Sequence, residues 1–268
     1  FTEFAQRMKN DEMITLAKFL AISGIILPML PHKNLIPDIN LTPYSIWLAT
    51  VVVSGISYLS YLLKRYVFHE SGVLVSGIIG GLYSSTATIS VLARKSRKAS
   101  EQEANEYVAA MLLAVSMMFL RFMILILIFS REIFTSIYPY LLIMSVVAAV
   151  VAWFIHSRHR RSKDMTDESE DEDSSNPLEF KVALIFATLF VVFTVLTHYT
   201  LVYAGTGGLN LLSFVSGLSD ITPFILNLLQ NTGSVAVLVV VACSMQAIIS
   251  NILVNMFYAL FFAGKGSK

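Results

Sequence analysis

Two charged side chains lie inside apolar stretches of this 268-residue chain, and they are the first candidates for binding chemistry. Arg121 stands in the middle of SMMFLRFMIL, and Asp220 stands in GLSDITP. An ionised side chain is costly in lipid, so we expect each of them to face a water-filled cavity or a partner. The alternative is structural: the two residues pair with each other, or Arg121 extends its charge to the membrane surface.

A second group of polar residues lies in the stretch GGLYSSTATISVL. Adjacent glycines tolerate the backbone angles of a chain reversal, and hydroxyls at the start of a helix can cap its free N–H groups. We therefore predict that Gly72–Leu92 is a broken helical hairpin that turns at Gly80 and Gly81. The alternative is that the small residues serve close helix packing, as in GxxxG motifs. The candidate binding residues here are Gly80, Gly81, Ser84, Ser85, Thr86 and Thr88.

A weaker echo of this stretch occurs in VSGLSDITPFILNLL. Thr222 precedes Pro223 there, which predicts a helix N-cap followed by the proline that suits a first helical turn. If both stretches are hairpins, their flanking spans run in opposite senses and form an inverted repeat, which is typical of transporters with a site near the membrane midplane. A chance match is the alternative. Because Arg121 corresponds in its span to Asn255 in the last one, we add Asn251 and Asn255 to the candidate site.

The motifs of common catalytic and metal sites do not occur in the sequence. It has no HExxH, CxxC or P-loop pattern, and no convincing grouping of Ser, His and Asp. We therefore expect no enzyme activity, no metal site and no cofactor. His198 and the single cysteine, Cys243, are expected to be structural.

Composition places these candidates in a membrane protein. Hydrophobic residues make up 56% of the chain, charged residues 14%, and the mean hydropathy is +0.70. A membrane-crossing helix needs about 20 mostly apolar residues, and the apolar runs predict an all-α polytopic membrane protein. The predicted full spans are about 14–30, 45–63, 107–129, 138–155, 178–199 and 235–262, and the predicted broken segments are 72–92 and 209–229.

The distribution of Lys and Arg favours hairpins over full crossings for the two broken segments. If all eight apolar segments cross, eight of these cations lie on the cytoplasmic side and ten on the other, against the positive-inside rule. If both broken segments enter and leave on one side, sixteen lie inside and only Lys33 and Arg131 lie outside. The first hairpin alone gives fourteen against four. We therefore predict a multi-pass protein of the cell membrane with both termini in the cytoplasm.

The predicted order along the chain is a first membrane unit (1–156), a charged flexible loop (157–177) and a second membrane unit (178–268). The loop carries a basic cluster followed by an acidic one and has no apolar periodicity, so it cannot bury a core of its own. The chain begins at Phe1 without the charged start and short apolar core of a signal peptide, and we expect it to be part of a longer protein.

Several stretches together resemble a known family. They are ILPMLPHKNLIP, INLTPYSIWLATVVVSGISYLSYLL, GVLVSGIIGGLYSSTATISVLARKSRK and AIISNILVNMFYAL, of which GGLYSSTAT and LTPYSIW are the specific parts. The family is the domain of unknown function that forms the C-terminal membrane half of many MgtC/SapB-related bacterial and archaeal proteins. The resemblance implies a bacterial or archaeal integral membrane protein whose MgtC-like part is missing or separate. It implies no substrate.

Three functions fit these observations. In the first, the protein is a transporter or channel for a small ion or solute, and two half-helix N-termini with Arg121 favour an anion. In the second, it transports a cation through Asp220, hydroxyls and exposed carbonyls, which hard cations prefer. In the third, it modulates a partner such as an MgtC-like domain without transport. For all three we expect contact with the lipid bilayer, a homo-oligomer formed through small-residue helix faces, and no nucleic-acid partner.

Overall fold

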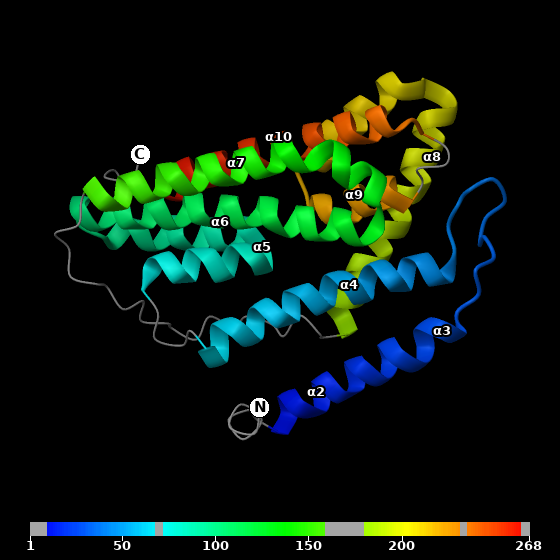
Figure 1. The fold of residues 1–268 in the computed structure, drawn as a ribbon, viewed down its shortest axis with the longest axis horizontal. Coiled ribbons are helices and arrows are strands. Elements are labelled where there is room, and N and C mark those ends of the chain that lie inside the picture. The colour runs from blue at the N-terminus through cyan, green and yellow to red at the C-terminus, as the bar shows by residue number, and fades with distance from the viewer. Residues whose placement is uncertain (1–9, 68–71, 159–179, 231–234, 264–268) are drawn as a thin grey trace. The chain divides into compact units, whose positions relative to one another are not determined.

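The computed structural model describes residues 10–67, 72–158, 180–230 and 235–263, and these residues are almost entirely helical (Figure 1). Within those ranges the only β pairing is an isolated bridge between Ile36 and Ile39. The all-α fold predicted from the sequence is therefore confirmed. The helices are α2 (Asn10–Ala21), α3 (Leu27–Met29), α4 (Pro43–Leu62), α5 (Val73–Lys95), α6 (Glu101–Phe129), α7 (Arg131–Arg158), α8 (Phe180–Ser216), α9 (Ile221–Gln230) and α10 (Val237–Phe262).

Six of the described helices are long and apolar enough to cross a membrane, which confirms the polytopic membrane class. They include α4, α6, α7 and α10, which match four predicted spans, and α8, which covers the fifth, 178–199, from residue 180 onward. The predicted span 14–30 corresponds to Met13–Met29, which is one of the shorter apolar helices. The sixth long helix is α5, and its length alone is misleading because its backbone is interrupted.

The chain forms two compact units that interleave in sequence. The first unit contains Phe1–Tyr58 and Ser175–Ser250, and the second contains Leu59–Ser174 and Asn251–Lys268. These units do not coincide with the predicted division into 1–156 and 178–268, because each takes helices from both parts. From residue 159 onward, the predicted charged loop lies outside the described residues.

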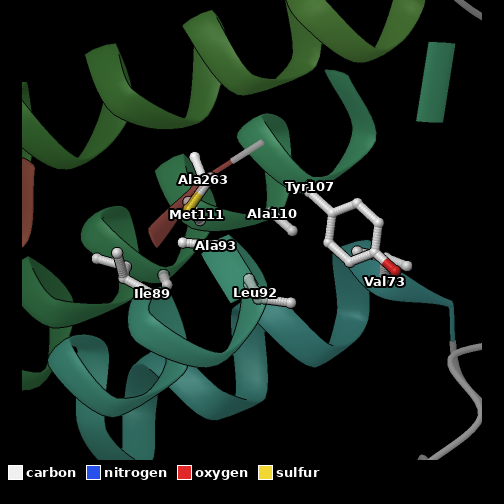
Figure 2. Packing of buried hydrophobic residues seen from close by; sticks show 9 residues of the cluster. Val73, Ile89, Leu92, Ala93, Tyr107, Ala110, Met111 and Ala263 are labelled. Carbon is white, nitrogen blue, oxygen red and sulfur yellow. The ribbon is translucent and has the colours of Figure 1, made fainter. Parts of the chain in front are cut away.

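In the second unit, α5, α6 and α7 pack side by side (Figure 1). Two serines join α6 to α7: Ser116 Oγ donates to the carbonyl of Ser145 at 2.9 Å, and Ser145 Oγ donates to the carbonyl of Ser116 at 3.1 Å. Hydroxyls that bond across helices are a common glue between membrane helices. A buried core joins both ends of α5 to α6 and the C-terminal end of α10 (Figure 2), and it contains Val73, Ile89, Leu92, Ala93, Tyr107, Ala110, Met111, Ala114 and Ala263.

The helix α5 consists of two antiparallel halves. Its backbone is non-helical at Ser84, with φ −158° and ψ 106°. A Cβ atom on Gly80 would lie 2.5 Å from Oγ1 of Thr88, although a continuous helix would separate these residues by about 12 Å. Val73 and Leu92 share one core, although a continuous helix would place them about 28 Å apart. Residues on either side of Ser84 therefore form a helical hairpin.

The turn of this hairpin lies at Ser84, and the prediction of a turn at Gly80 and Gly81 is wrong. The glycines stay helical, and their lack of a side chain permits close approach. A Cβ atom on Gly81 would lie 2.5 Å from Cα of Ala114 in α6, and one on Gly80 would meet the returning half of α5. Close packing of small residues, the alternative interpretation, therefore describes these two glycines.

In the first unit, α8 is also interrupted. Gly205 has φ 60° and ψ −153°, a conformation that residues with a side chain rarely adopt. A Cβ atom on Gly208 would lie 2.8 Å from Cγ2 of Thr200, although a continuous helix would separate them by about 12 Å. The chain therefore turns back at Gly205 along the first part of α8.

The short helix α9 then runs beside the first part of α8, in the same direction as that part. The ring centroid of Phe224 lies 5.7 Å from that of Phe193, and Asn227 Nδ2 donates to Oγ1 of Thr197 at 2.8 Å. Later residues of α9 thus meet later residues of α8. Residues 206–230 form a second hairpin, which corresponds to the broken segment predicted over 209–229, while its position in a membrane stays a prediction.

Candidate functional site

The tip of the α5 hairpin is the first part of the candidate site. Ser84 precedes the second half of α5, and its Oγ accepts a hydrogen bond from the N–H of Ala87 at 3.4 Å. A hydroxyl in this N-cap position satisfies one of the N–H groups that a helix start leaves free. The predicted capping by hydroxyls is therefore confirmed at Ser84. The break also removes the carbonyl partners that a continuous helix would give to the N–H groups of Ser85 and Thr86.

Arg121 reaches this tip from α6. Its Nη1 donates to the carbonyl oxygen of Tyr83 at 2.6 Å, across 38 positions in the sequence. In a continuous helix this carbonyl would accept the N–H of Ala87. Arg121 and Ser84 thus bond two backbone groups that flank the break, the carbonyl of Tyr83 and the N–H of Ala87.

The direction of the arginine side chain explains this contact. Arg121 lies two turns beyond Ala114, so it shares the face of α6 that packs against the glycines of α5. Val73 of α5 and Tyr107 of α6 lie in one core and mark a common starting level. Measured from that level, Tyr83 lies about 15 Å along α5 and Arg121 lies about 21 Å along α6. A helical side chain points toward the N-terminus of its helix, so the arginine reaches back over the difference.

Three hydroxyls near the tip have no hydrogen bond within the described ranges. Ser85 is 8% exposed, and Thr86 and Thr88 are half-buried. By contrast, Ser90 Oγ donates to the carbonyl of Thr86 at 2.8 Å, as a serine inside a helix commonly does. Ser85 is the most buried of these three residues, so its hydroxyl is the first candidate ligand group at this tip.

Asn251 and Asn255 belong to the part of α10 that lies in the second unit. Both are buried, and Asn255 Nδ2 donates to Oδ1 of Asn251 at 3.2 Å. Oδ1 of Asn255 is buried without a hydrogen-bond partner among the described residues. Ala263 packs beside Met111 at one end of this unit, and counting back along α10 from there places both asparagines at about the height of Arg121.

The tip of the second hairpin carries Asp220. Its Oδ1 accepts a hydrogen bond from the N–H of Thr222 at 2.9 Å, so Asp220 is the residue that caps α9. The prediction of Thr222 as N-cap is wrong by two positions, because α9 begins at Ile221 and Thr222 already lies in its first turn, 3% exposed. The carboxylate of Asp220 itself is exposed.

Replacing Asp220 with Ala is expected to lower the free energy of unfolding by about 1 kcal/mol, because the first turn of α9 loses its cap. Asn caps a helix about as well as Asp, so Asp220→Asn should leave stability nearly unchanged. Thermal unfolding of both variants in detergent measures this difference. Equal losses in the two variants would show that the charge, rather than the cap, stabilises this turn.

The structure brings some of the predicted residues together. In the second unit, Arg121 bonds the carbonyl of Tyr83, which directly precedes the predicted residues 84–88, and Asn251 bonds Asn255. Asp220 and Thr222 form a separate group in the first unit. The pairing of Arg121 with Asp220 and the binding role of every candidate residue stay predictions.

One buried amide, Asn227, is absent from the predicted site residues. It is 0% exposed and donates to the carbonyl of Phe193 and to Oγ1 of Thr197. Its signal was available, since it is an amide in the apolar stretch ITPFILNLL. No group of three or more His, Cys, Asp or Glu that could hold a metal ion occurs in the part of the chain that the structure describes.

Comparison with known proteins identifies one family. Residues 51–263 match the domain of unknown function DUF4010. An uncharacterized protein of Aquifex aeolicus (strain VF5) is 27% identical over 199 residues, which cover 73% of this chain and 84% of that protein. No solved structure matches the chain.

Proposed function

The chain belongs to the DUF4010 family, and from that premise we propose that it is a membrane transporter or channel for a small ion or solute, with an anion as the favoured class. One observation carries the proposal: α5 is interrupted within an apolar stretch, and a cation from a neighbouring helix reaches the break. Non-helical backbone at membrane depth is tolerated only where protein surrounds it or water reaches it. Interrupted helices of this kind build the substrate sites of many transporters.

The local charges support an anion. The N-terminus of a helix carries roughly half a positive charge, and the second half of α5 begins beside the guanidinium of Arg121. No Asp or Glu occurs between Gly72 and Ser100 or between Tyr107 and Phe129. The proposal assigns the protein no chemical step.

Cation transport is the second candidate, and the exposed carboxylate of Asp220 favours it. This carboxylate already accepts the N–H of Thr222, so a bound cation would share it with the start of α9. A hard cation prefers several oxygen ligands, and the capping bond occupies one of the oxygens that Asp220 offers.

The proposal includes a place in the cell. We assign the protein to the cell membrane, with both termini in the cytoplasm, as a homo-oligomer that associates with an MgtC-like domain. Two contacts support a shared side for the C-terminal end of α10 and the basic end of α5. Arg97 Nη2 donates to the carbonyl of Phe261 at 3.0 Å, and Arg94 lies over the ring of Phe262. Regulation of that domain without transport is the remaining alternative.

A flux measurement tests the transport proposal. Proteoliposomes that contain the wild-type protein are expected to take up at least one labelled anion faster than empty liposomes. Arg121→Ala should reduce this flux by about tenfold or more, which corresponds to roughly 1.4 kcal/mol in the barrier. Arg131→Ala is the matched control, because Arg131 is exposed at the start of α7 and should be replaceable without effect.

Arg121→Lys distinguishes loss of the positive charge from a general loss of folded protein in this assay. It keeps the cation, so partial flux in Arg121→Lys with none in Arg121→Ala supports a role in binding. If no anion or cation is carried faster than in empty liposomes, the transport proposal is wrong.

A further inference from the structure

The two hairpin tips differ in local charge. At the second tip, α9 begins next to its own carboxylate, because Asp220 caps the N–H of Thr222. At the first tip, the second half of α5 begins with a neutral cap, Ser84, and receives the guanidinium of Arg121. An anion is therefore repelled at one tip and attracted at the other.

The first tip offers several donors of different kinds. Ser85 and Thr86 stand in the first turn after the break, where a helix start leaves N–H groups without helical partners. The hydroxyls of both residues form no hydrogen bond within the described ranges. The guanidinium of Arg121 carries five N–H donors, and one of them bonds the carbonyl of Tyr83 at the tip. Ser85 as a residue is 8% exposed, so its hydroxyl is held within the packed tip rather than in open solvent.

We propose that the tip of the α5 hairpin binds an oxoanion, such as sulfate, phosphate or a carboxylate, through Ser85, Thr86 and Arg121. The inference rests on the proposed transport function and names its substrate class and its position. An oxoanion presents several acceptor oxygens to several donors, and a guanidinium matches a planar or tetrahedral oxoanion through two parallel hydrogen bonds. A halide is a single acceptor atom, so it cannot form two parallel hydrogen bonds with a guanidinium. The second tip takes no part in binding the anion.

Binding to the purified protein tests the inference independently of flux. Equilibrium dialysis with radiolabelled sulfate, phosphate and formate is compared with chloride at constant ionic strength, in nanodiscs of phosphatidylcholine. At least one oxoanion is expected to bind about tenfold or more tightly than chloride. A parallel set of nanodiscs with added phosphatidylglycerol distinguishes the source of the ligand, since a lipid phosphate that occupies the tip would weaken binding of the free ion.

Two serines of the same half-helix provide a matched pair of variants. Ser85→Ala removes an unbonded hydroxyl at the tip and should weaken oxoanion binding about tenfold, the effect of one hydrogen bond to a charged ligand. Ser90→Ala removes a hydroxyl that is already bonded to Thr86, so its binding should match the wild type. Arg121→Lys should weaken binding further, because a lysine cannot form the paired hydrogen bonds.

The outcomes separate this inference from the transport proposal. Equal affinity for chloride and oxoanions, or equal affinity in Ser85→Ala and Ser90→Ala, overturns the oxoanion site. Cation flux without any anion binding overturns the site while transport stands. Oxoanion binding that depends on Ser85, with no flux of any solute, supports the site and overturns transport.

Discussion

Alanine at both Gly77 and Gly81 is expected to separate α5 from α6 and to unfold much of the second unit. A Cβ atom on Gly77 would lie 2.3 Å from the carbonyl oxygen of Ala110, and one on Gly81 would lie 2.5 Å from Cα of Ala114. Both neighbours are backbone atoms of a packed helix, so no flexible side chain can move aside. Overpacking of this kind costs about 1–3 kcal/mol at each site, a large part of a typical protein's stability.

The measurement is the fraction of protein that stays monodisperse in detergent after heating. Gly207→Ala is the matched control, because a Cβ atom there would meet nothing within 4 Å. Ala also has the higher helix propensity, so this variant should be at least as stable as the wild type. A double variant as stable as Gly207→Ala would mean that the two helices do not approach as closely as the structure shows.

The number and approximate length of the long helices could be predicted because a membrane span requires about 20 consecutive, mostly apolar residues. Long apolar runs identify them, and the predicted spans 45–63, 107–129 and 235–262 agree with α4, α6 and α10 to within a few residues. The first apolar run is the exception. Met13–Met29 is a shorter apolar helix that includes a π-helical stretch at Ile22–Ile26.

The break in α5 could be predicted, but its position could not. The stretch GGLYSSTATISVL contains both glycines and hydroxyls, and either type can end a helix. The choice depends on packing: Gly81 is needed where α6 approaches, which leaves the turn to Ser84. The break at Gly205 was missed, although the sequence AGTGG shows three glycines there.

Polar residues inside the apolar runs could be recognised from the sequence, and their contacts could be predicted only in part. A binding role for these residues stays a prediction. Arg121 was identified because a charge inside an apolar run is rare. Its contact with the carbonyl of Tyr83 could not be predicted, since a backbone acceptor has no sequence signal and lies 38 positions away. The cap of α9 shows the same limit on a smaller scale: both Asp220 and Thr222 suit an N-cap, and the bond shows that Asp220 is the one used.

We predict that the chain enters and leaves α5 on the same side of the membrane, and labelling from one side or the other distinguishes this from a full crossing. Residues 73–83 rise about 16 Å, roughly half of a hydrocarbon core of about 30 Å. A hairpin of this length that enters the bilayer reaches no further than its middle and returns, so we predict that both ends of α5 lie on one side. Single cysteines at Lys64 and Ser100, two exposed positions before and after α5, should react with an impermeant maleimide from the same side of oriented vesicles.

Two further positions calibrate this experiment, which uses a Cys243→Ala background because that native cysteine is buried. Lys33→Cys lies before α4 and Arg131→Cys lies after α6, and both are exposed. If α4 and α6 each cross the membrane once, these two cysteines should react only from the side opposite to Lys64 and Ser100. Reaction of Lys64→Cys and Ser100→Cys from opposite sides would mean that α5 opens into a full span, because only a continuous helix carries the chain across. The tip at Ser84 would then lose its neighbour Arg121, and with it the physical basis for an anion site.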